Sequence, residues 1–137
     1  MPRQSPIPEP LDREFYAAAN DERLVLQHCA RCDRWQYPPE PVCAECARAD
    51  RLAWRETDGR GTIHSFAVIH DTQIASLRPD LPYTVAVIGL DACPGIVMLS
   101  QLPGTESDEV RIGRPVRLTF LTTEATGQKV PEWEVVA

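Results

Sequence analysis

After residue 50, apolar and polar residues alternate along much of the chain with a period of two, which is the pattern of half-buried β-strands. Segments rich in glycine, proline and aspartate interrupt the alternation, as turns do. Five or six short strands within roughly 80 residues predict a small β-sandwich or barrel. The strand-like runs are residues 51–57, 62–71, 83–90, 95–102, 115–122 and 130–136.

The N-terminal part of the chain has a different pattern. Residues 1–10 contain four prolines and predict an extended, mobile arm. A short helix is expected over residues 12–19, with Asp12 as its N-cap. Leu11, Phe15 and Ala18 fall at helical spacing, so we expect one face of this helix to pack against the rest of the protein.

Between the helix and the strands lie two CxxC pairs, separated by ten residues. A CxxC pair forms a tight knuckle that directs two thiolates at one metal ion, and two knuckles give the tetrahedral all-thiolate set that suits zinc. The spacer is long enough for a short hairpin, as in a zinc ribbon. We therefore expect one structural Zn²⁺, because four thiolates leave no open position for a reacting water. The predicted ligands are Cys29, Cys32, Cys43 and Cys46.

Three alternatives for these cysteines follow from the residues alone. Disulfides are disfavoured if the protein is in a reducing compartment. A rubredoxin-like iron site fits the same geometry, but such sites usually carry glycine after each knuckle, where this chain has Asp33 and Ala47. A redox-active dithiol would not need two matched pairs. His28 adjoins Cys29, and we interpret it as a surface residue at a strand end.

Composition limits the function classes. The apolar fraction of 43% and the charged fraction of 25% are typical of a soluble globular protein. No apolar run reaches membrane-spanning length and no signal segment stands at the start, so we expect a cytoplasmic protein with no membrane association. The net charge of −6 argues against nucleic-acid binding.

A few further residues could carry chemistry. His64 and His70 are expected on one face of the same strand, about 20 Å apart, too far to share a metal ion. Cys93 lies in a predicted turn with no base nearby in the sequence, so we interpret it as an incidental free thiol. The long break at residues 71–82 carries exposed apolar residues that either cover the barrel end or meet a partner. No sequence motif of a self-contained active site is present.

A zinc ribbon followed by a small barrel resembles the family catalogued as domain of unknown function 35, and the resemblance covers nearly the whole chain. The CxxC spacing together with the later Gly-Arg-Gly-Thr strand is the most specific part. The residues that carry the resemblance are Phe15-Tyr16, 23–29, Cys32, 37–43, Cys46, Trp54, 59–66, Pro82-Tyr83, Leu99-Ser100 and 110–116.

The resemblance implies a mainly β fold: an N-terminal arm and helix (residues 1–22), a rubredoxin-like zinc ribbon (23–50) and a five-stranded OB-fold barrel (51–137). It also implies a non-catalytic accessory subunit of a hetero-oligomer. The expected partner is a thiolase-fold protein, either a lipid-transfer-type aldolase or an acyltransferase of lipid or sterol metabolism, and the expected ligand is acyl-CoA. We expect ligand or partner contacts at Phe66, His70, Arg78, Pro82 and Tyr83.

The residues are also compatible with other functions. The chain could instead be a subunit of a hot-dog-fold enoyl-CoA hydratase, an independent enzyme or electron carrier, or a single-stranded nucleic-acid-binding OB module with Trp35, Tyr37 and Trp54 as stacking residues. The segment 31–60 holds six arginines but also six acidic residues, so it has no net charge. For CoA phosphates, Arg60, Arg78 and Arg114 are the arginines that we consider.

Overall fold

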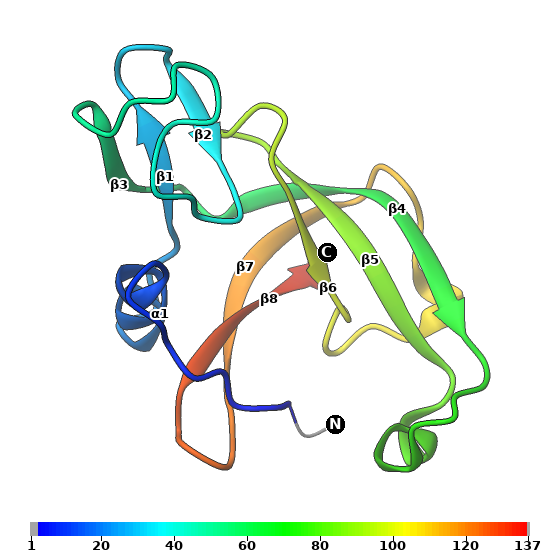
Figure 1. Ribbon diagram of the computed structural model, residues 1–137. Helices are drawn as coiled ribbons and strands as arrows, with labels where there is room; N and C mark the ends of the chain where they lie inside the picture. The colour runs from blue at the N-terminus through cyan, green and yellow to red at the C-terminus, as the bar shows by residue number, and fades with distance from the viewer. Residues whose placement is uncertain (1–2, 137) are drawn as a thin grey trace.

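The computed structural model describes residues 3–136 and consists of one α-helix, two short 3₁₀ helices and two antiparallel β-sheets (Figure 1). Figure 1 shows the smaller sheet above α1 at the left and the larger sheet at the right. The elements are α1 Arg13–Asn20, β1 Val25–Cys29, β2 Arg34–Gln36, β3 Leu52–Glu56, β4 Arg60–Ile69, η1 Ala75–Asp80, β5 Tyr83–Leu90, β6 Val97–Ser100, η2 Ser107–Glu109, β7 Pro115–Thr122 and β8 Lys129–Val135.

The smaller sheet has the strand order β2-β1-β3, and its central strand β1 ends at Cys29, the first cysteine of the motif. Strand β3 pairs with β1 along its whole length, from Val25 opposite Glu56 to Cys29 opposite Leu52. We expected residues 51–57 to be the first strand of the barrel series. The alternation shows which positions face a core, but it does not show which neighbouring strand supplies the pairing.

The larger sheet has the order β6-β5-β4-β7-β8 and curls until its edge strands approach each other. At that seam, the Ser100 hydroxyl accepts a hydrogen bond from the Trp133 backbone N–H at 3.0 Å. The predicted mainly β fold, with a helix, a ribbon and a nearly closed five-stranded barrel, is confirmed.

Strand β4 lies between β5 and β7 and pairs with both at Gly61, which is opposite Leu90 on one side and Val116 on the other. A Cβ atom at Gly61 would lie 2.6 Å from Cγ2 of Ile88 and 3.0 Å from the carbonyl oxygen of Gly89. Only glycine therefore allows this close approach, which explains the second glycine of the Gly-Arg-Gly-Thr motif.

A β-bulge between Ile63 and Ser65 changes the face pattern of β4. Ile63 is fully buried, and after the bulge Phe66 pairs with the fully buried Ala86 and packs against the core. Strict alternation across residues 62–71 was therefore wrong. His64 lies at the bulge and does not share a face with His70, because the extra residue reverses the side-chain alternation.

One continuous hydrophobic core joins the helix, the small sheet and the barrel. Phe15 from α1 and Leu24 and Leu26 around β1 belong to the same buried cluster as Ile88 of β5 and Trp133 of β8. Phe15 and Ala18 are buried as predicted, whereas Leu11 is 41% exposed. The ribbon is thus packed onto the barrel through its base.

The N-terminal arm differs from the mobile segment that we expected. Arg3 forms an ion pair with Glu132 of β8 at 3.1 Å, and the Ser5 hydroxyl accepts a hydrogen bond from the Thr126 N–H at 3.2 Å. Proline content favours an extended arm, but this ion pair holds the arm along the β8 side of the barrel. Residues 1 and 2 of that prediction lie outside the described residues.

Asp12 occupies the predicted N-cap position, but its side chain accepts a hydrogen bond from the Glu9 N–H at 2.7 Å and makes none to the helix. Within residues 3–136 no helix is both long and apolar enough to cross a membrane.

Candidate metal centre

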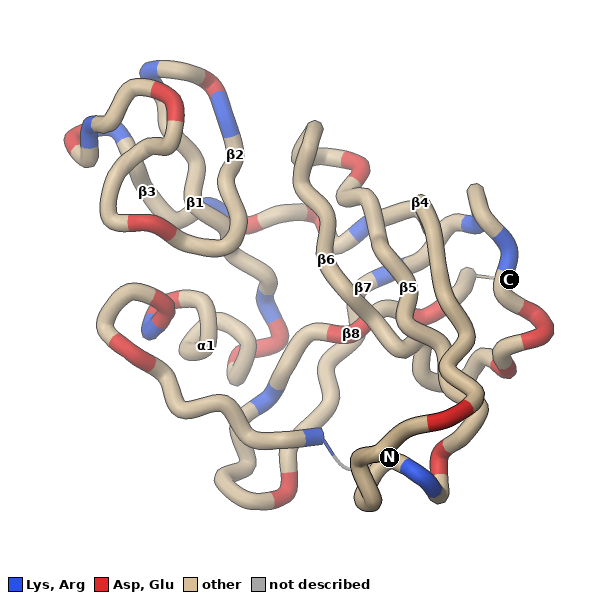
Figure 2. Tube along the Cα trace, turned by 45° about the vertical axis from the view of Figure 1, so that its right-hand side comes forward, with Lys and Arg blue, Asp and Glu red and all other residues tan. Residues whose placement is uncertain are grey.

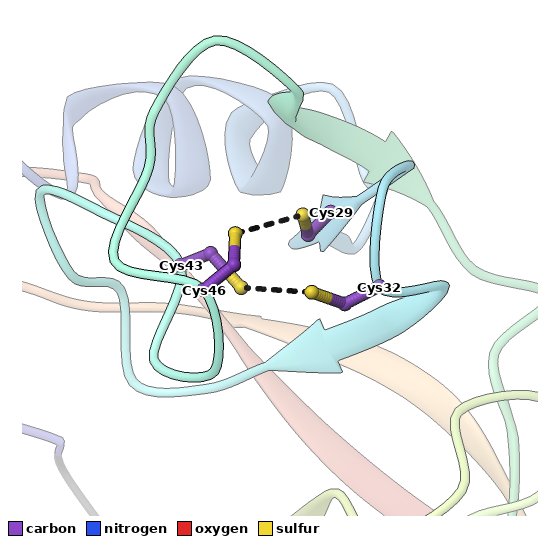
Figure 3. A group of neighbouring side chains, drawn as sticks. All are labelled: Cys29, Cys32, Cys43 and Cys46. Atoms are coloured by element: carbon purple, nitrogen blue, oxygen red, sulfur yellow. Dashed lines mark hydrogen bonds between the residues drawn. The ribbon is translucent and has the colours of Figure 1, made fainter.

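The four cysteines of the motif come from two turns that face each other. Cys29 is the last residue of β1, and the turn after it returns the chain as β2, so the first CxxC is the tip of a hairpin. The second CxxC is a turn closed by hydrogen bonds from the Cys43 N–H to the Arg48 carbonyl and from the Ala47 N–H to the Cys43 carbonyl, each 2.9 Å long. Figure 3 shows the four sulfur atoms pointing toward one another.

The sulfur positions fit a tetrahedral metal site. All four Sγ atoms lie within 4.8 Å of one another, and the Cys29–Cys46 and Cys32–Cys43 sulfur pairs are each 4.0 Å apart. Zinc–sulfur bonds of about 2.3 Å in a tetrahedron place the sulfurs about 3.8 Å apart. A separation of 4.0 Å is about twice a disulfide bond length, so these pairs are not disulfides.

Local hydrogen bonding favours a thiolate at Cys43. The backbone N–H groups of Cys46 and Glu45 point at its sulfur and lower the pKa of that thiol to about 7. Cys32 differs, because loss of hydration and hydrogen bonds to the other cysteines raise its pKa to about 12. Thiolates are the metal-binding form of cysteine, so the N–H groups of the second knuckle prepare that turn for a cation.

The residues that follow the two knuckles adopt the left-handed conformation, although neither is glycine. Asp33 has φ 50° and Ala47 has φ 59°. Glycine favours this region, and aspartate tolerates it better than alanine. The departure from glycine noted in the sequence therefore changes the local strain and leaves the four sulfurs convergent.

Two glutamines that we did not single out in the sequence hold the connection between the knuckles. The Gln27 side-chain oxygen accepts hydrogen bonds from Gln36 Nε2 at 2.7 Å and from the Glu40 N–H at 2.9 Å. Gln36 in turn accepts from the Ala44 N–H at 2.9 Å. The only sequence signal was a polar residue, Gln27, inside an apolar strand, where it is 6% exposed.

His28 is not the surface residue that we expected. Its side chain is 9% exposed, its Nε2 lies 3.0 Å from a carboxylate oxygen of Asp33, and its ring meets Trp35 edge-on at 5.0 Å. Pairing with β2 on one side and β3 on the other buries this position. Its imidazole thereby connects β1 to Asp33, the residue with positive φ that follows the first knuckle.

The aromatic residues considered for base stacking contact other parts of this protein. Trp35 carries the Arg55 guanidinium over its ring at 5.4 Å, and Tyr37 lies 5.8 Å from the Phe15 ring. Trp54 packs against the core cluster. That the chain does not bind nucleic acid stays a prediction.

The five predicted ligand or partner contacts do not form one site. His70 and Pro82 line the same pocket of about 550 Å³ at the end of β4. Phe66 faces the core, whereas Tyr83 lies opposite Ile69 on the other face of the sheet. Arg78 lies in η1, where its Nε donates to the Thr72 carbonyl at 3.3 Å. No residue of η1 is buried, and Ile74 beside it is 57% exposed.

The three arginines considered for phosphate binding are also separated. Arg60 begins β4 and lines a groove of about 580 Å³ between the ribbon and the barrel. Arg78 follows the other end of that ten-residue strand, about 30 Å away at strand rise. Arg114 lies beside the β4–β7 junction, and its guanidinium reaches the Glu109 carbonyl at 3.5 Å.

Cys93 is fully buried at the turn between β5 and β6. Burial raises the pKa of its thiol, with a smaller opposing effect of the nearby Thr57 hydroxyl. It belongs to the hydrophobic core, which explains its presence in a turn.

The fold and the four-cysteine site define a protein of the zinc-ribbon and OB-fold class. Two family models match consecutive parts of the chain: the rubredoxin-like zinc ribbon domain of ChsH2 at residues 17–53 and the C-terminal OB-fold domain of ChsH2 at residues 54–121. A DUF35 domain-containing scaffold protein of Methanothermobacter thermautotrophicus is 30% identical over 105 residues, which are 77% of each chain. The chain belongs to this DUF35 family.

Two further relatives have more specific names. A probable enoyl-CoA hydratase alpha subunit of Thermomonospora curvata is 33% identical over 112 residues, but this chain spans only 33% of its length. The solved Ltp2-ChsH2(DUF35) aldolase contains a chain that matches with a TM-score of 0.82 and 28% identity, covering 97% of this chain and 100% of that one. The accessory, partner-binding character of the family is therefore supported, and acyl-CoA-related enzymes recur among the relatives.

Proposed function

We propose that this chain is an accessory subunit that binds a thiolase-fold enzyme of acyl-CoA metabolism, an aldolase or an acyltransferase, and helps to position the acyl-CoA. The observation that carries the proposal is the full-length structural match to a chain of the Ltp2-ChsH2(DUF35) aldolase. Because the match spans the ribbon and the barrel together, it concerns the arrangement of both parts and not an OB fold alone.

We further propose that the four cysteines bind one Zn²⁺ with a structural role. The strands of the small sheet are only three to five residues long, so the sheet has little core of its own. A closed four-thiolate ion would join its two turns and would leave no coordination position for substrate. The nucleophile and the acid–base groups then belong to the partner enzyme.

For the acyl-CoA, Arg60 is the arginine that we favour for a phosphate contact. Two other arginines of its groove already have acidic partners: Arg117 pairs with Glu134 at 2.7 Å and Arg23 with Asp21 at 3.9 Å. Among the described residues no acidic side chain pairs with the Arg60 guanidinium. Glu56 and Asp58 also line the groove, so a bound phosphate would lie on the Arg60 side.

Co-expression with the thiolase-fold protein of the same genome that is most similar to Ltp2 tests the proposal. We expect the two chains to elute together in size-exclusion chromatography, with light scattering giving a hetero-oligomer mass. We also expect retro-aldol or acyl-transfer turnover to depend on the presence of this chain. A monomeric chain that neither binds the enzyme nor changes its turnover would contradict it.

A second partner class is favoured by one specific observation, the hydratase name of the relative from Thermomonospora curvata. A hot-dog-fold enoyl-CoA hydratase subunit of the same genome should therefore be tested in parallel. Co-elution with this subunit, and not with the thiolase-fold protein, would favour a hydratase complex.

A further inference from the structure

The outer face of the barrel strands β4, β5 and β6 is apolar where solvent-exposed sheets are usually polar. Inward positions of these strands, such as Ala86, Ile88 and Met98, are buried in the core. The opposite positions form one continuous surface, because Leu99 lies opposite Val87 and Val87 lies opposite Ser65. We call this surface the apolar sheet face: Ser65, Ala67, Ile69, Tyr83, Val85, Val87, Gly89, Val97 and Leu99.

The most exposed part of the apolar sheet face is the edge strand β6. Leu99 is 65% exposed and Val97 is 49% exposed. Edge strands of soluble proteins usually carry a charged residue or a proline that discourages association, and β6 has neither. Figure 2 shows β5 and β6 without a charged residue, whereas β8 carries residues of both signs.

The pattern of β5 indicates that both faces of the strand are covered in the working assembly. An antiparallel strand with one solvated face alternates between apolar and polar residues. In β5 the outward positions Tyr83, Val85 and Val87 are apolar as well, although the inward positions already form the core. A strand buried on one face only would not need them.

Area and charge decide between a second copy of this chain and a different protein. Three strands about 4.8 Å apart and about 20 Å long give a face of roughly 300 Å², below the roughly 800 Å² per partner of a stable interface. The surrounding rim must therefore contribute. A symmetric dimer would bring two copies of the same chain together, and a net charge of −6 on each copy disfavours that association.

We propose that the apolar sheet face is the docking surface for the thiolase-fold partner, with Leu99 and Val97 of β6 as its most exposed contacts; this inference rests on the proposed function. The complementary surface on the partner is an uncharged apolar patch. Its rim contacts fall on the charged residues that flank β6, including Asp91 beside Thr62, whose hydroxyl donates to the Asp91 carboxylate at 3.0 Å.

The test uses Leu99→Glu and, as a matched control, Ile112→Glu. Ile112 is 67% exposed, as much as Leu99, but it lies in the loop before β7 and outside the apolar sheet face. Each variant and the wild-type chain are titrated against the purified thiolase-fold protein by calorimetry. An unpaired carboxylate buried against an apolar partner surface should raise Kd at least about thirtyfold, so we expect that loss for Leu99→Glu and less than a threefold change for Ile112→Glu.

Thermal unfolding of the isolated chains checks that both variants fold, which we expect because both side chains are already exposed. If the wild-type chain does not bind the thiolase-fold protein, the proposed function fails. If it binds and Leu99→Glu binds equally well, the docking surface is wrong while the function stands. If light scattering shows that the wild-type chain alone forms a dimer that Leu99→Glu dissociates, the occupant is a second copy and the inference is overturned.

Discussion

Replacing Gly61 by alanine tests the close approach of β4 to β5 at the point where β4 also pairs with β7. The added Cβ would lie 2.6 Å from Cγ2 of Ile88 and 3.0 Å from the Gly89 carbonyl oxygen. Favourable carbon–carbon contacts are about 3.5–4.0 Å long, so the first contact is about 1 Å too short. The carbonyl oxygen is part of the backbone and cannot rotate away. Strands β4 and β5 must therefore separate locally.

The magnitude follows from two opposing effects. Overpacking a core lowers the free energy of unfolding by about 1–3 kcal/mol. Alanine also restricts the unfolded chain, which raises the free energy of unfolding by about 0.4–1 kcal/mol. We expect Gly61→Ala to lower the free energy of unfolding by about 1–2 kcal/mol, or about 4–8 °C in Tm for a domain of this size. Equilibrium urea unfolding measures the first quantity and calorimetry the second.

Gly89→Ala is the matched control, because Gly89 lies on β5, opposite Thr62, the neighbour of Gly61 in β4. Its Cβ would meet only the Thr62 carbonyl oxygen, at 3.9 Å. Without a clash, the restriction of the unfolded chain should leave this variant as stable as wild type or about 0.5 kcal/mol more stable. If Gly61→Ala is as stable as Gly89→Ala, the close approach of β4 to Ile88 is not real and this account of the barrel is wrong.

Three other predictions concern the cysteines and their surroundings. Elemental analysis should find one zinc per chain, and Cys43→Ser should lose it together with the thermal stability of the small sheet; iron with a visible absorption band would contradict this. Ala47→Gly should stabilise the metal-loaded protein by about 0.5–1 kcal/mol in urea unfolding, because φ is 59°, whereas Asp33→Gly should not, because it loses the bond to His28. Burial raises the pKa of Cys93, so the neutral thiol is favoured in the folded state. The free energy of unfolding should therefore be unaffected by this group below the ordinary thiol pKa and should fall as pH rises above about 9. Cys93→Ala should remove that part of the slope, and an unchanged slope would refute the assignment.

The sequence predicted most elements because their signals are local. The limits expected for 83–90 and 115–122 coincide with those of β5 and β7, since turn residues end both strands sharply. The convergence of the four cysteines followed from the geometry of two CxxC knuckles, each of which needs only its own turn.

The features that the sequence did not predict depend on contacts between distant residues. The bulge at His64 needs the register of β5 as well as that of β4, and nothing in residues 62–71 alone requires it. Burial of His28 comes from strands on both sides of β1. The docked arm depends on Glu132, which is separated from Arg3 by nearly the whole chain. In each case the pattern of one segment leaves the position of its partner open.

The metal centre and the apolar sheet face lie on different sheets but depend on one core. Leu24 and Leu26 stand at the base of the strand that ends in Cys29, and they share a buried cluster with Ile88 and Met98. Those two residues are the inward neighbours of Val87 and Leu99 on β5 and β6. A metal ion that joins the two turns of the ribbon would hold β1 in place, and Leu26 of β1 belongs to the buried cluster that also contains the inner residues of β5 and β6. A structural metal ion that touches no substrate would therefore still stabilise the core that lies beneath the docking surface.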